Sequence, residues 1–246
     1  SDGDLVLRGS NLLPSQLTSL VFGMMDRSTI TINAVLPSLQ CLEVDAAELV
    51  LARKRLQLPQ LTRLSLSHIG SVTVSWPALP QLAALSVWQC GTLPPDGLSA
   101  LGRLTSLTLG YLWREESWVT SDNVLQSAPP SVRHLYLHGP RGNWSQPPPL
   151  RCVPQLTSLA CDSPAIIAHL TVLKQLQHLE FPASSAQDLS QADVHGLGRL
   201  TSLRQLVFGK KLEGDLNGAG RRIQVGDGKC LLRPSRPMQS NRVLGT

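Results

Sequence analysis

The chain has 246 residues, of which 42% are hydrophobic, 16% are charged and 4% are aromatic. This composition excludes a disordered chain and predicts an aliphatic core. The formal net charge of +5 is confined to residues 210–246, which hold eight Lys/Arg and three Asp/Glu, whereas residues 1–209 hold 14 of each sign. The body of the protein is therefore neutral overall.

Five cysteines are scattered along the chain without a C-x-x-C pair: Cys41, Cys90, Cys152, Cys161 and Cys230. This pattern indicates neither a disulfide framework nor a zinc module, and it favours a reducing compartment, so we expect a cytoplasmic protein. The uncharged stretch between Arg63 and Asp96 is interrupted by Pro77 and Pro80. We therefore expect no membrane span.

Repeated hydrophobic phrases organise the chain from its first residues. Leu5, Val6 and Leu7 have the pattern of the second half of a repeat unit whose first half is absent, so we expect a fragment of a longer array. The phrase L-x-x-L-x-L, with conservative replacements, then recurs nine times at steps of 20 to 28 residues. The first positions of the nine phrases are Leu17, Leu39, Leu61, Leu82, Leu104, Val132, Leu156, Leu176 and Leu203. Nine units in register indicate a repeat architecture.

The fourth and sixth residues of each phrase alternate with period two, which is typical of a strand that buries one face. Stacked strands of this kind build one continuous core. The pattern resembles the leucine-rich-repeat family over roughly residues 5–209. The resemblance implies an α/β solenoid, with a curved, parallel β-sheet on the concave face and mixed short helices, turns and short strands on the convex face. Only Cys90 matches the family's usual Asn or Cys three residues after the sixth position, so we expect an irregular subtype.

The segments between phrases predict a convex side that changes along the chain. Residues 29–32 and 71–74 alternate and are β-branched, which favours short extended segments, whereas residues 165–170 and 191–197 are predicted to be helical. After Phe208 the repeat pattern ends. We therefore predict a solenoid of about nine full units and a partial first one over residues 1–209, followed by a Gly-rich, basic and disordered tail over 210–246.

The third, fifth and seventh residues of each phrase are expected to face solvent on the concave side, and most of them are small and polar. Large side chains at these positions are the type that dominates binding energy at protein interfaces. These candidate partner-binding residues are Arg63, Trp88, His134, Tyr136, His138, His178 and Glu180. The alternative is that Trp88 and Tyr136 merely cover neighbouring units.

Two connections are longer than the others and carry three of the five tryptophans. Residues 110–131 contain Trp113 and Trp118, and residues 139–150 contain Trp144. Because insertions in a solenoid lie outside its core and often contribute to binding, these three residues are further candidates for partner contacts. A linker-like excursion is the alternative interpretation.

The sequence predicts no catalytic, cofactor-binding or metal-binding residues. His134 and His138 lie four residues apart on an expected strand, a separation of about 13 Å, whereas zinc ligand atoms lie about 2 Å from the metal. No nucleophile elbow, phosphate-binding loop or H-E-x-x-H motif occurs. The basic tail predicts at most weak, charge-driven contact with nucleic acid.

These observations predict a non-enzymatic protein–protein interaction module that binds another protein on its concave face and needs no cofactor. One alternative is the substrate-recognition part of an F-box-type ubiquitin-ligase adaptor, whose helical segment would lie upstream. A fragment of a leucine-rich-repeat receptor ectodomain is another, which fits less well because paired cysteine caps and the usual Asn ladder are missing.

Overall fold

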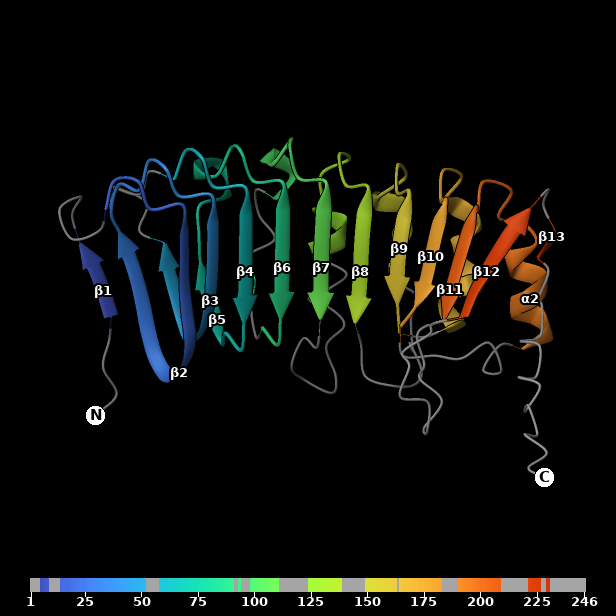
Figure 1. Ribbon diagram of the computed structural model, residues 1–246, viewed down its shortest axis with the longest axis horizontal. Coiled ribbons are helices and arrows are strands. Elements are labelled where there is room, and N and C mark those ends of the chain that lie inside the picture. The colour runs from blue at the N-terminus through green and yellow to red at the C-terminus, as the bar shows by residue number, and fades with distance from the viewer. Residues whose placement is uncertain are drawn as a thin grey trace, which may run out of the picture.

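A computed structural model of the chain describes residues 5–8, 14–51, 58–90, 93, 98–110, 124–138, 149–162, 164–182, 190–208, 221–226 and 229–230. One main sheet runs the length of these residues, with its strands side by side in chain order (Figure 1). Nine parallel strands form the body of the sheet: β2 (Ser19–Asn33), β3 (Cys41–Leu51), β4 (Arg63–Ser67), β6 (Ala84–Trp88), β7 (Ser106–Gly110), β8 (His134–His138), β9 (Ser158–Cys161), β10 (His178–Phe181) and β11 (Gln205–Phe208).

The register of the sheet follows the repeat phrase position by position. Each of the nine strands begins at the third residue of its phrase, and the fourth residues of neighbouring strands are partners, as in Leu64, Leu85, Leu107 and Leu135. The fourth and sixth residues point into the core, where Leu107 is 1% exposed and Leu109 is 3% exposed. The predicted repeat and its register are confirmed.

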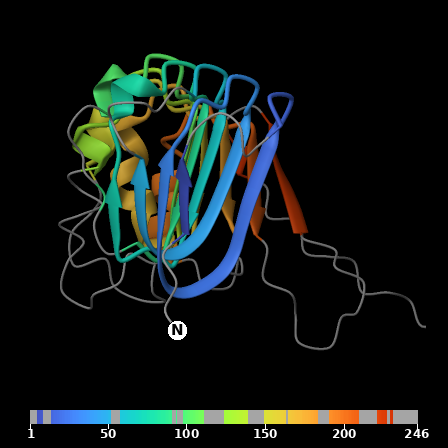
Figure 2. The same ribbon diagram turned by 90° about the vertical axis from the view of Figure 1, so that its left-hand side faces the viewer.

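A second layer lies behind the main sheet and closes the core from the other side (Figure 2). In the first units this layer consists of paired extended segments. β1 (Leu5–Arg8) pairs with the second half of β2, and the second half of β2 pairs with the second half of β3. The second half of β3 also pairs with β5 (Ser71–Thr73). Ile30 and Leu49 of these segments are fully buried. The extended segments predicted at 29–32 and 71–74 are therefore present, and β1 aligns with the second half of a unit, as its sequence predicts.

Helices replace these strands in the later units. The 3-10 helices η1 (Trp76–Ala78), η2 (Leu98–Ala100), η3 (Leu150–Cys152) and η4 (Pro164–Val172) precede α2 (Gln191–Leu197). Both predicted helical segments are confirmed, the first of them as a 3-10 helix. The α2 helix begins with a capping box in which Asp193 N donates to Ser190 Oγ at 3.2 Å and Ser190 N donates to Asp193 Oδ2 at 2.9 Å. Among the described residues, no helix is both long and apolar enough to cross a bilayer.

The irregular units satisfy their backbone without the usual Asn ladder. At the entry to the strands, the second residue of each phrase bonds to the second residue of the preceding phrase, as Thr105 N donates to Ala83 O at 2.9 Å. The hydroxyls of Thr62, Thr105 and Thr157 donate to the same preceding carbonyls at 3.0 to 3.3 Å. At the exit, His68 and Gln89 turn the chain with φ of 56° and 49°, and their amides donate to the following strand. These bonds pair backbone groups at both ends of the strands.

The last part of the sheet reverses direction. Strand β12 (Arg221–Gly226) pairs antiparallel with β11, and β13 (Lys229–Cys230) pairs antiparallel with β12. Both strands fall within residues 210–246, where the sequence predicts no regular element because the repeat phrase is missing. Most of that segment lies outside the described residues, so the division of the chain at residue 209 stays a prediction.

Candidate functional site

The face of the main sheet that points away from the second layer carries the third, fifth and seventh residues of each phrase. In β4, β6 and β8 these side chains are exposed or half-buried, whereas the fourth and sixth are buried, so the predicted alternation is present. This is the face called concave in the expectation above, and we name it the open face. Most of it consists of small residues such as Ser65, Ser86, Ser106, Thr108 and Ser158.

Trp88 does not stand upright on the open face but lies across the neighbouring strand. Its partner in the sheet register is Gly110, at the same phrase position on β7. A Cβ atom built at Gly110 would lie 2.3 Å from Trp88 Cε3 and 2.7 Å from Cζ3. The indole therefore covers the space that any side chain at this position would occupy, and only glycine permits this arrangement.

By crossing β7, the indole reaches two aromatic side chains on β8. The ring centroid of Trp88 lies 5.8 Å from that of Tyr136 and 5.2 Å from that of His138, both in tilted arrangements. The rings of Tyr136 and His138 are stacked with centroids 6.0 Å apart. These separations lie in the range of favourable aromatic contacts. We call Trp88, Tyr136 and His138 the aromatic cluster.

Polar contacts hold the aromatic cluster in place from both sides. Trp88 Nε1 donates a hydrogen bond of 2.8 Å to Ser86 Oγ, two residues earlier on the same strand. His138 Nδ1 contacts a carboxylate oxygen of Asp162, whose side chain is 6% exposed. Because a carboxylate oxygen accepts, Nδ1 carries the hydrogen of this contact. The Tyr136 hydroxyl lies 3.4 Å from the same nitrogen. The indole and the imidazole therefore each have a fixed orientation.

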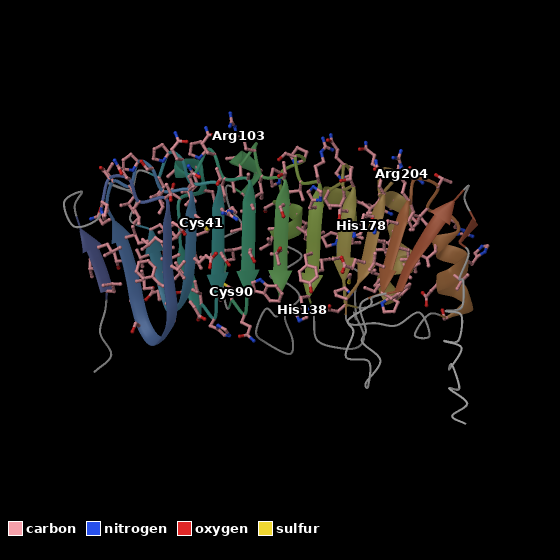
Figure 3. The ribbon with its side chains drawn as sticks, viewed as in Figure 1. Cys41, Cys90, Arg103, His138, His178 and Arg204 are labelled. Atoms are coloured by element: carbon pink, nitrogen blue, oxygen red, sulfur yellow. The ribbon has the colours of Figure 1, made fainter. Side chains whose placement is uncertain are left out.

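The other candidates on the open face lie apart from this cluster. Arg63 and His134 are exposed at the beginning of β4 and β8, and His178 Nε2 lies 3.5 Å from Glu180 Oε2 on β10. His178 lies near the entry of its strand, whereas His138 lies at the exit of β8 (Figure 3). Trp113, Trp118 and Trp144 lie outside the described residues. The structure thus brings together three of the seven open-face candidates.

No metal site is formed by these side chains. Within the described ranges, no group of three or more His, Cys, Asp or Glu side chains is placed to hold a metal ion. The paired imidazole and carboxylate of His138 and Asp162 orient the cluster.

Two residues that build the cluster are absent from the candidates predicted from the sequence. Gly110 leaves the space that the Trp88 ring occupies, and Asp162 provides the carboxylate that contacts His138. Both occupy the seventh position of their phrases, as Trp88 and His138 do. The seventh positions of four successive phrases are Trp88, Gly110, His138 and Asp162. A large residue next to a glycine in this order, and a histidine next to an acid, are the sequence features that could have predicted the contacts.

The open sheet of stacked phrases, backed by a layer that changes from strands to helices, has the fold of a leucine-rich-repeat solenoid. No family model matches the chain, and no curated protein matches it. Among solved structures it is similar to TLR13 in a TLR13–ssRNA13 complex, with 18% identity, a TM-score of 0.47 and coverage of 78% of this chain and 36% of that chain. It is also similar to an internalin (inlF) from Listeria monocytogenes str. 4b F2365, with 16% identity, a TM-score of 0.34 and coverage of 73% and 67%. The chain spans about a third of the TLR13 chain it matches.

Proposed function

We propose that this chain is a non-enzymatic protein-recognition module that binds a partner protein over the aromatic cluster on its open face. The observation that supports this function is the fixed cluster of Trp88, Tyr136 and His138 on a face where many other side chains are small. The residues that dominate protein interfaces are mostly Trp, Tyr and Arg surrounded by weaker contacts.

The fixed orientation of the cluster lowers the cost of binding. A side chain that is mobile before association loses about 0.5–1.5 kcal/mol of conformational freedom when a partner immobilises it. Trp88 is already held by Ser86 and by its contact with His138, and His138 is held by Asp162. A partner that packs on these rings therefore gains apolar contact without ordering them.

The surrounding small residues leave room for the partner to approach. Thr108 on β7 and Ala160 on β9 flank Tyr136, and Ser106 and Ser158 on the same strands flank His134; all four are half-buried. We propose that Arg63, His134, His178 and Glu180 make peripheral contacts, and that Trp113, Trp118 and Trp144 extend the interface from the two long connections.

The test compares partner binding by the wild-type chain with binding by a Trp88→Ala/Tyr136→Ala double variant. The partner is captured from a native lysate and identified, and its affinity is then measured with purified components by calorimetry. We expect the double variant to bind at least about thirtyfold more weakly, because loss of an interface hot spot costs about 2 kcal/mol or more.

The matched control is Val21→Ala. Val21 is 59% exposed on β2, three strands away from β6 in the sheet order, and its substitution removes apolar surface outside the cluster. All variants are first shown to melt cooperatively. Equal affinity for the wild type and the double variant contradicts the proposed site, as does an equal loss in the Val21→Ala control.

A further inference from the structure

Charge is segregated between the two ends of the strands, although the sequence of the body is neutral overall. Of the Lys/Arg side chains described between residues 58 and 208, Arg151 lies in η3 and the other six lie at the start of a strand or shortly before one. There are seven in all. They are Arg63, Arg103, Arg133, Arg151, Lys174, Arg199 and Arg204. Figure 3 shows Arg103 and Arg204 at the same edge of the sheet, opposite to His138.

The carboxylates of the same stretch lie elsewhere. Three are described: Asp162 follows β9, Glu180 lies within β10, and Asp193 caps the first turn of α2. Each of them is engaged, with His138, His178 and the Ser190 backbone amide. Among the described residues, the edge where the strands begin is therefore cationic without a balancing acid.

Four of the cations lie along the edge where the strands begin, and we call them the basic edge: Arg103, Arg133, Lys174 and Arg204. They belong to the segments entering β7, β8, β10 and β11. The backbone ladder at the second phrase position fixes two of them, because Arg133 N donates to Thr105 O at 2.8 Å and Arg204 N donates to Gln177 O at 2.8 Å. Arg103 lies two residues before Thr105, and Lys174 lies three residues before Gln177. Neighbouring strands lie about 4.8 Å apart, so the basic edge spans about 19 Å.

The described contacts leave the charges of the basic edge uncompensated. Arg103 donates to the amide oxygen of Gln81, and Arg133 Nη1 donates to the backbone oxygen of Gln155 at 3.1 Å, so both partners are neutral. Each ion pair in the described part of the chain involves a histidine rather than a Lys or Arg. Arg103, Lys174 and Arg204 are exposed. Guanidinium groups held in this way retain further N–H donors for an anionic ligand.

We propose that the basic edge is a second binding surface, separate from the aromatic cluster, and that it binds an extended acidic peptide segment of a partner protein. An extended chain rises about 3.3 Å per residue, so about six residues match the length of the basic edge. The arginine forks suit carboxylates, which they bind in a bidentate manner.

A polypeptide fits this edge better than a single-stranded nucleic acid does. Proteins that bind single strands combine a basic groove with aromatic rings on which the bases stack. Here the described rings nearest to the basic edge are the imidazoles of His134 and His178, at the first residues of β8 and β10. The indole and the phenol belong to the half-buried aromatic cluster, whose His138 lies at the other end of the strands (Figure 3). Along the basic edge the described side chains between the cations are mainly Gln, Thr, Ser and Pro, and no Trp, Tyr or Phe is among them.

The experiment measures binding of a fluorescein-labelled oligoglutamate peptide to the full chain by fluorescence anisotropy. The edge variant is Arg103→Gln/Arg133→Gln/Lys174→Gln/Arg204→Gln. The matched control is Lys210→Gln/Lys211→Gln/Arg233→Gln/Arg236→Gln, which removes the same charge from the basic C-terminal segment. We expect the edge variant to bind at least about tenfold more weakly and the control to change affinity less than about twofold, with a binding constant that falls as salt rises.

Arg133 is half-buried and donates to Gln155, so a triple variant that keeps Arg133 and changes only Arg103, Lys174 and Arg204 preserves this contact. This triple variant should still show most of the loss of peptide affinity. Equal weakening by the edge and control variants, or binding lost only in the control, overturns the proposal. Tighter, edge-dependent binding of an oligothymidylate of equal charge also overturns it and assigns the edge to nucleic acid. The Trp88→Ala/Tyr136→Ala variant should bind the peptide like the wild type, so failure of either site is distinguished from failure of the other.

Discussion

The indole of Trp88 occupies the position where a side chain of Gly110 would stand. The two residues are 22 positions apart in the chain and are direct partners in the register of β6 and β7. A Cβ at Gly110 would approach the Trp88 ring to 2.3 Å, far inside van der Waals contact. This one relationship lets an aromatic residue of β6 reach two aromatic residues of β8 across an intervening strand.

Gly110→Ala should displace the Trp88 ring and break its contacts with Tyr136 and His138. We expect a loss of near-ultraviolet circular dichroism from Trp88 and a destabilisation of about 1–3 kcal/mol, as for other overpacked sites. Gly102→Ala is the control, because a Cβ there meets nothing within 4 Å. In a Trp88→Ala background the cost of Gly110→Ala should disappear. Persistence of the full cost in that background would show that the glycine is required for another reason.

Leu107→Asp should abolish cooperative folding. Leu107 is 1% exposed in the middle of the solenoid, and a buried, unpaired carboxylate there costs more than about 4 kcal/mol. Thr108→Asp introduces the same charge one residue later on the open face and should cost less than about 1 kcal/mol. Urea denaturation followed by circular dichroism distinguishes the two variants. Similar midpoints for both would mean that the assigned register of β7 is incorrect.

Ser190→Ala should destabilise the α2 end of the solenoid by about 0.5–2 kcal/mol, because it removes the hydroxyl that accepts from Asp193 N. Ser190→Thr keeps a hydroxyl at the same position and should recover most of this free energy. Hydrogen exchange of the α2 amides reports the local effect, and denaturant melts report the global one. An alanine variant with unchanged exchange in α2 argues against the capping box.

His138→Ala should reduce stability by about 1–3 kcal/mol, because it removes the imidazole that contacts the Asp162 carboxylate, whose side chain is 6% exposed. His134→Ala, on the same strand but at an exposed position, should change the free energy of unfolding by less than about 0.5 kcal/mol. Chemical denaturation of the two variants gives the comparison. Equal and small effects would mean that the pair adds nothing to the stability of the folded chain.

The sequence by itself determined the architecture of this protein. Nine phrases predict nine strands, and each strand begins at the third residue of its phrase, as for Arg63, Ser106 and Gln205. The alternation of leucines predicts which side chains enter the core, and β-branched or helical segments between phrases predict the second layer. These features are predictable because strand and helix periodicities are local properties of the chain, and because each stacked unit has nearly the same local structure as its neighbours.

The tertiary structure alone decided which side chains of the open face work together. Trp88, Gly110, His138 and Asp162 lie on successive units, and their contacts depend on how far each side chain leans across the sheet. The same holds for the basic edge, because a neutral sum of charges over residues 1–209 does not reveal that cations gather where strands begin. Contacts between units join residues more than 20 positions apart, and their geometry is set by packing and register rather than by the local pattern of the sequence.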